Sequence, residues 1–193
     1  DCQNYTIDGP NNQTLRAQIN RAKNKGVAVE KIMSSADGEF EGTVKLAIEH
    51  VLKRWMDARP IAILKFMVTL EPLSFAHEKR YFLALHRGQP VGFLAAVPVY
   101  GQDGWFFEDV IRTPDAPNGT SELLIHEAMM DAKLSGFRFA TLGLAPLARL
   151  SQDSKDSLFA GRIGEAIQAC VKGLYDFDGL YRFKARFNPH RWT

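Results

Sequence analysis

The chain has 193 residues and a formal net charge of +2, from 24 basic and 22 acidic residues. Hydrophobic residues make up 46% and charged residues 24%, a composition that argues against a disordered or fibrous chain. This length supports one sizeable hydrophobic core. Because the net charge is so small, any binding of anions must come from local clusters of basic residues.

Cysteine content and hydropathy exclude further classes of protein. Cys2 and Cys170 are too few for a disulfide framework or a cysteine-only zinc site, so we expect a reducing compartment. A membrane-spanning helix needs about 20 mostly apolar residues, and the longest apolar runs are interrupted by Lys65 and Pro98. The first residues resemble no secretion signal and include no initiator Met, so we expect a soluble piece of a longer protein.

Hydrophobic periodicity predicts alternating helices and strands in the first part of the chain. Residues 1–13 are polar and are expected to form a flexible lead-in. Leu15, Ile19 and Ala22 recur at helical spacing, and Gly26 follows where a helix C-terminal cap belongs. The predicted elements are a helix over 14–25, a strand over 27–32 and a helix over 40–58.

The middle and end of the chain predict a sheet covered by helices. Three strands separated by Gly-containing turns indicate an antiparallel meander, and a helix–strand unit follows. The predicted fold class is α+β (mixed α/β), with a central, largely antiparallel sheet flanked by helices in a single domain over 14–193. The predicted elements are strands over 81–86, 91–100, 105–111, 139–144 and 180–187, and helices over 121–134 and 162–175.

Several common catalytic motifs are absent from the sequence. It contains no phosphate-binding P-loop, no Gly-rich dinucleotide motif, no H-E-x-x-H and no G-x-S-x-G, and its five histidines are scattered. Metal-dependent hydrolysis and Ser-His-Asp catalysis are therefore poor interpretations. No metal and no cofactor are expected.

One candidate site lies where the strand over 105–111 passes into a polar loop. Asp109 and Arg112 stand at the end of this strand, and the loop holds two prolines followed by Asn118 and Gly119. Backbone N–H groups at the start of the next helix, near residues 120–122, would favour an anion. The alternative is a structural ion pair between Asp109 and Arg112 with a simple Asn-Gly turn.

A second candidate site is the basic segment near the C-terminus. On a strand, alternate side chains share a face, so Arg182, Lys184 and Arg186 would form a row of cations about 13 Å long. Repulsion within such a row favours an anionic partner. The alternative is the solvated face of an edge strand, where basic residues hinder aggregation.

Three segments, taken together and in order, resemble one known family. This family is the C-terminal catalytic domain of phosphatidylglycerol lysyltransferases, also called multiple peptide resistance factors or aminoacyl-phosphatidylglycerol synthases. The helix over 15–27 also resembles the family's long helix, so the resemblance covers nearly the whole chain. The segments are Asp109-x-x-Arg112 with Pro117-Asn-Gly and Glu122-Leu-Leu-Ile, then Leu142-Gly-Leu-Ala-Pro-Leu, and finally Gly179-Leu-Tyr-Arg-Phe-Lys-Ala-Arg-Phe-x-Pro.

The resemblance implies a fold and an activity. The fold would be the second of two tandem domains similar to GCN5-type N-acetyltransferases. The activity would be transfer of a lysyl or alanyl group from aminoacyl-tRNA to phosphatidylglycerol. The partners would then be aminoacyl-tRNA, phosphatidylglycerol and the membrane surface, reached at the cytoplasmic face of the cell membrane through a transmembrane part that this sequence does not contain.

The resemblance also implies roles for individual residues. Asp109 and Glu165 would hold the ammonium of the aminoacyl group, since carboxylates pair with cations. The cationic side chains would bind the tRNA 3′ end and the lipid phosphate. The family's motifs match Asp109, Arg112, Lys184 and Arg186 as catalytic residues and Glu165 on the penultimate helix, with Glu165, Asn118, Glu122 and Arg182 as candidate substrate-binding residues.

Two other functions remain open. A CoA-dependent N-acetyltransferase of the same fold would bind pyrophosphate on a Gly-rich loop. The equivalent loop here, over 112–120, has one glycine, two prolines and Asp115, which fits pyrophosphate poorly. A non-catalytic module that binds anionic lipid or RNA would use the basic side of the first helix.

Overall fold

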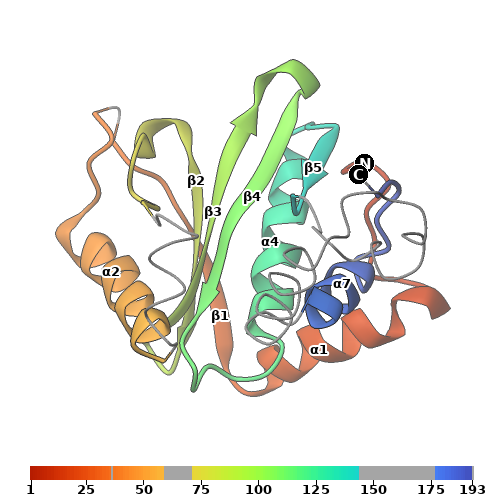
Figure 1. Cartoon of the computed structure of the whole chain (residues 1–193), viewed down its shortest axis with the longest axis horizontal. Helices are drawn as coiled ribbons and strands as arrows, with labels where there is room; N and C mark the ends of the chain where they lie inside the picture. Colours follow the sequence, from red (N-terminus) through yellow and green to blue (C-terminus); the bar gives the residue numbers. More distant parts are fainter. Residues whose placement is uncertain (36, 59–70, 144–176, 193) are drawn as a thin grey trace, which may run out of the picture. The chain divides into compact units, whose positions relative to one another are not determined.

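A five-stranded sheet flanked by helices forms the first part of the molecule (Figure 1). The computed structural model describes residues 1–35, 37–58, 71–143 and 177–192. It divides the chain into two compact units, Asp1–Gly143 and Leu144–Thr193, which are described separately below. The prediction of an α+β fold with a largely antiparallel sheet is confirmed.

The sheet has the strand order β1-β2-β3-β4-β5. The first four strands pair in antiparallel fashion, and β5 pairs with β4 in parallel. The predicted strands of the first unit are confirmed, with ends that differ by at most three residues. The strands are β1 (Val27–Ile32), β2 (Arg80–His86), β3 (Gln89–Val99), β4 (Gly104–Arg112) and β5 (Phe139–Thr141).

Helices cover both faces of this sheet. The helix α2 (Gly42–Asp57) lies on one face, and α4 (Thr120–Leu134) lies on the other, with α1 (Gln13–Asn24) packed against α4 (Figure 1). Each helix was predicted from its apolar spacing, and each lies within two residues of the predicted bounds. Short 3-10 turns complete the unit: η1 (Pro10–Asn12), η2 (Ala76–Glu78) and η3 (Tyr100–Gln102).

The face under α2 holds a tightly packed apolar cluster. Ile48 and Val51 of α2 are 1% and 0% exposed and pack against side chains of β2, β3 and β4. Burial of each such aliphatic side chain stabilises the fold by about 1.5–3 kcal/mol. The sheet residues of this cluster are Tyr81, Leu83, Phe93, Ala95 and Ile111.

The parallel pairing between β4 and β5 is short. It joins Gly104 to Phe139 and ends where Phe106 meets Thr141. A Cβ atom on Gly104 would lie 2.2 Å from the Phe139 carbonyl oxygen, so only glycine permits this close approach. Within the described residues, the rest of β4, from Phe107 onward, has no strand beside it on this edge.

Residues before α1 pack on the C-terminal part of α4 and the turn after it. Cys2 and Tyr5 are buried, and the Cys2 N–H donates to the Arg138 carbonyl oxygen at 3.0 Å. The Tyr5 hydroxyl lies 3.1 Å from His126 Nδ1 on α4. The division into a lead-in over 1–13 and a single domain over 14–193 stays a prediction.

The second unit contains a helix where a strand was expected. The segment α7 (Phe177–Ala185) is helical, so the predicted strand over 180–187 is wrong. Its alternating aromatic and basic residues fit the two-residue period of a strand. Phe183 and Phe187, however, stand four residues apart, which fits a helical turn, and their ring centroids are 5.6 Å apart. The predicted helix over 162–175 lies outside the described residues.

Candidate active site

Asp109 lies just after an irregularity in β4. Ala95 of β3 pairs with Asp109, but the next residue, Ala96, pairs with Phe107, which leaves Glu108 as an extra residue in β4. An extra residue of this kind is a β-bulge, and it reverses the face to which the following side chains point. Asp109 and Ile111 therefore point to the α2 face, where Ile111 belongs to the apolar cluster.

On that face, Asp109 ends a row of three side chains across the sheet. Tyr81 pairs with Ala95, and Ala95 pairs with Asp109. Directly opposed residues on neighbouring strands share a face, and the small Ala95 side chain separates the other two. Asp109 is 8% exposed and Tyr81 is 1% exposed. The Tyr81 hydroxyl donates to the Pro72 carbonyl oxygen at 2.6 Å.

The surroundings of Asp109 make its carboxyl titrate near neutral pH. Burial, followed by the negative charge of Glu108, raises the pKa of Asp109 to about 6, although the Lys79 ammonium opposes this shift. Burial and the charges of Asp109 and Glu108 also raise the pKa of Tyr81 above its usual range. At pH 7, Asp109 is mostly ionised beside a protonated phenol, so it can pair with a cation or accept a proton.

Arg112 points to the other face of the sheet. Pairing is regular from Asp109 to Arg112, and Arg112 stands opposite Gly92. A Cβ atom on Gly92 would lie 3.3 Å from side-chain atoms of both Leu124 and Thr120 of α4. Gly92 and the opposed Arg112 therefore face α4. Accordingly, among the described residues no ion pair joins Asp109 to Arg112.

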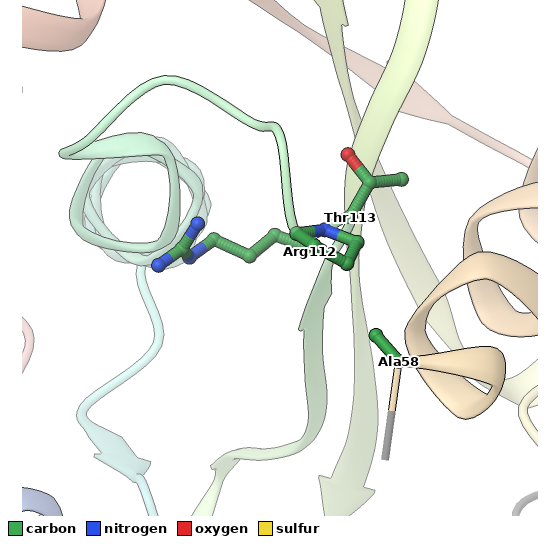
Figure 2. A pocket seen from close by; sticks show the side chains of 4 residues that line it. Ala58, Arg112 and Thr113 are labelled. Carbon is green, nitrogen blue, oxygen red and sulfur yellow. The ribbon is translucent and has the colours of Figure 1, made fainter.

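The Arg112 side chain extends from the end of β4 toward α4, away from Ala58 (Figure 2). Its Nη1 donates to the Ala116 carbonyl oxygen at 3.4 Å. Arg112 lines an open pocket of about 370 Å³ together with Ala58, Thr113 and Pro114. The strand end thus borders a hollow on the surface, and Asp109 is not among the residues that line it.

The start of α4 is packed closely against α1. Gly119 has a φ of 94°, and a Cβ atom there would lie 2.0 Å from the Gln18 carbonyl oxygen. The Thr120 N–H and hydroxyl both donate to the Pro117 carbonyl oxygen, at 3.2 and 2.7 Å. Asn118 is exposed and Glu122 is 6% exposed. Binding of an anion here, or of substrate by Asn118 and Glu122, stays a prediction.

Arg182 and Lys184 lie on α7, and Arg186 lies in the turn directly after it. Side chains four residues apart share one side of a helix, whereas side chains two residues apart do not. Arg182 and Lys184 lie two residues apart within α7 and therefore point to different sides of it, and Arg186 follows the end of the helix, so the predicted row of three cations on a strand is wrong. Lys184 is 9% exposed and burial lowers its pKa, while Arg182 is exposed. Glu165 lies outside the described residues.

Sequence reasoning missed the ion pair beside Asp109. Lys79 Nζ lies 2.9 Å from Glu108 Oε2, and the Lys79 side chain is only 8% exposed. A signal was available in the sequence: Phe106 and Phe107 adjoin, as do Glu108 and Asp109, so the strict alternation of a flat strand is broken. No cluster of His, Cys, Asp and Glu suited to a metal ion occurs in the described part of the chain.

None of the helices in the described ranges combines the length and the apolar content needed to cross a bilayer.

Two solved structures show the same fold. One is L-PGS from Bacillus licheniformis, with a TM-score of 0.75 and 21% identity, covering 98% of this chain and 55% of that one. The other is the C-terminal domain of a lysylphosphatidylglycerol synthetase from Agrobacterium fabrum, with a TM-score of 0.68, 21% identity and the same coverage.

Curated relatives of this chain are phosphatidylglycerol lysyltransferases. The phosphatidylglycerol lysyltransferase of Bacillus subtilis (strain 168) is 33% identical over 103 residues, which are 53% of this chain and 12% of that protein. The phosphatidylglycerol lysyltransferase of Staphylococcus epidermidis (strain RP62A) is 22% identical over 199 residues, and the match covers 98% of this chain but 22% of that protein. The family described as "Phosphatidylglycerol lysyltransferase, C-terminal" matches residues 1–193. The chain belongs to this family.

Proposed function

We propose that this chain is the acyl-transfer part of an enzyme that moves a lysyl or alanyl group from aminoacyl-tRNA to phosphatidylglycerol. Membership of the family supports an aminoacyltransferase that acts on this lipid. The observation that carries the proposal is the Asp109 carboxyl, which the β4 bulge turns to the α2 face and whose pKa is raised to about 6.

The reaction needs few chemical groups from the protein. A hydroxyl of the lipid head group attacks the ester carbonyl, the new ester bond forms, and the bond to the tRNA ribose oxygen breaks. The proton of the lipid hydroxyl ends on that ribose oxygen. A carboxylate with a pKa near 6 suits transient acceptance of this proton, or pairing with the aminoacyl ammonium. Transfer then proceeds mainly by positioning, without a covalent enzyme intermediate.

The cationic residues are proposed to bind phosphates. Arg112 stands beside an open pocket, and phosphate groups are strong acceptors for guanidinium donors. Lys184 and Arg186 would bind the tRNA 3′ end or the lipid phosphate, with Arg182 as a further contact and Glu165 holding the aminoacyl ammonium. We further propose that the rest of the protein holds this domain at the cytoplasmic face of the membrane.

A transfer assay tests the proposal. The full-length protein is incubated with tRNA that carries labelled lysine or alanine and with vesicles that contain phosphatidylglycerol, and the lipid fraction is then separated by chromatography. We expect label in a lipid product. Vesicles without phosphatidylglycerol and uncharged tRNA with free labelled amino acid are the controls. A lipid product formed equally in either control would contradict the proposed donor or acceptor.

A further inference from the structure

A partly exposed ion pair connects the start of β2 to the bulge in β4. Lys79 directly precedes β2, and its ammonium bonds to the Glu108 carboxylate at 2.9 Å. The Lys79 side chain is 8% exposed, whereas the Glu108 side chain is 41% exposed. A lysine is seldom buried unless its charge is paired, so the local fold depends on Glu108 standing where the bulge places it.

Glu108 is also the residue that makes the bulge. Phe107 and Asp109 pair with Ala96 and Ala95, and Glu108 is the extra residue between them. If residues 107–109 ran as a regular strand without the bulge, Asp109 would point to the same face as Phe107, away from α2. The ion pair is therefore made by the same residue whose insertion determines the direction of the Asp109 side chain.

The two members of the pair act on the Asp109 carboxyl with opposite sign. The negative charge of Glu108 raises its pKa, and the positive charge of Lys79 lowers it, on top of the larger effect of burial. Among the described residues, Tyr81 of β2 is a further titratable neighbour of Asp109, and Ile48 and Val51 of α2 pack on the same face of the sheet. Glu108 and Lys79 are therefore the charged groups that balance the ionisation of Asp109.

We propose that Lys79 and Glu108 are positioning residues for Asp109, holding the β4 bulge that turns its carboxyl to the α2 face and balancing the charge around it. The inference rests on the proposed function for its catalytic meaning. It goes further in naming two residues that would act on transfer through Asp109 without touching the substrate.

The test is a titration of the Asp109 carboxyl by ¹³C NMR in the full chain, assigned by its loss in Asp109→Asn. Lys79→Met leaves the Glu108 charge unbalanced and should raise the pKa of Asp109. Glu108→Gln leaves the Lys79 charge and should lower it. Lys79→Arg keeps the charge and should restore the original value. Shifts of Lys79→Met and Glu108→Gln in the same direction, or no shift, would overturn the inference.

A parallel assay separates this inference from the proposed function. In the full-length protein, the acid limb of the pH–rate profile should shift to higher pH for Lys79→Met and to lower pH for Glu108→Gln. The profile of Lys79→Arg should stay close to that of the wild type. If Lys79→Met fails to fold, the double variant Lys79→Met/Glu108→Gln removes both charges together: a titration that stays at its original position would show that the pair does not hold the bulge, and a changed titration would support the proposal. A carboxyl titration that shifts while the pH–rate profile stays unmoved would contradict the role of Asp109 in transfer, not the pairing.

Discussion

The Asp109 carboxyl is unusual because the fold holds it at a cost to stability. An aspartate that is 8% exposed, with Glu108 beside it, takes up a proton more readily in the folded chain than in the unfolded chain. Groups tuned in this way are typical of functional sites, where chemistry requires a pKa near neutrality. Asp109 thus differs from Asp115, whose exposed carboxyl accepts a hydrogen bond from Thr113 that lowers its pKa.

This difference predicts the pH dependence of stability. The pKa of Asp109 rises from 3.8 to about 6 on folding, so its contribution becomes unfavourable as pH rises from about 4 to about 6. Asp109→Asn removes that penalty, and it should raise the free energy of unfolding at about pH 7.5 by up to about 3 kcal/mol, with little gain at about pH 4. Urea unfolding at the two pH values measures the difference.

Asp115→Asn is the matched control for this measurement. The lowered pKa of Asp115 means that its ionised form favours folding, so the substitution should slightly reduce stability at neutral pH. A stabilising effect of Asp109→Asn that is equal at both pH values would show that packing, and not ionisation, is responsible.

Motif matching singled out Asp109 and Arg112 from the sequence, but their geometry could not be predicted. An unbroken strand would leave residues 109 and 112 on opposite faces, and the bulge at Glu108 decides which of the two faces α2. The bulge depends on a long-range contact between Glu108 and Lys79, which are 29 residues apart. Local periodicity carries little information about such a contact.

At the level of elements, the close packing of α1 on α4 depends on one glycine. Gly119 combines a φ of 94° with a Cβ position 2.0 Å from the Gln18 carbonyl oxygen of α1. Gly136, after the other end of α4, has a φ of 83°, but its Cβ position is open. The two glycines therefore share the backbone strain that alanine would introduce and differ only in the steric clash.

Alanine substitutions at Gly119 and Gly136 should reduce the free energy of unfolding by different amounts. Gly136→Ala should reduce the free energy of unfolding by about 1 kcal/mol, the usual penalty for a non-glycine residue with positive φ. Gly119→Ala should reduce it by several kcal/mol, on the order of 3 or more, because α1 and α4 must also move apart. Thermal and urea unfolding of both variants provide the measurement, and equal losses would contradict the proposed clash.

Elements were predicted well where one period dominated and poorly where two periods competed. The helix α1 has three buried apolar residues at helical spacing, and no alternating pattern competes with it. In α7, basic and aromatic residues alternate, and the same aromatic residues also fit a helical repeat. The sequence alone does not separate the two patterns in so short a segment, and the Phe183–Phe187 ring pair, with its four-residue spacing, accompanies the helix.

At the scale of the whole molecule, fold class and family could both be predicted from the sequence. A strand meander followed by a helix and a parallel strand allows few arrangements, because sequential strands usually pair with their neighbours. The chain spans about a fifth of its relative from Staphylococcus epidermidis. Activity is therefore best measured in the full-length protein, where every part of the enzyme is present.

The central claim is that the Asp109 carboxyl takes part in aminoacyl transfer. The most direct test compares the full-length protein with its Asp109→Asn variant in the rate of label transfer from lysyl-tRNA to phosphatidylglycerol. Loss of a proton-transfer group typically costs about 100-fold or more. We predict a loss of this size in a variant that folds and is at least as stable as the wild type. A variant that transfers label within about twofold of the wild-type rate would contradict the claim.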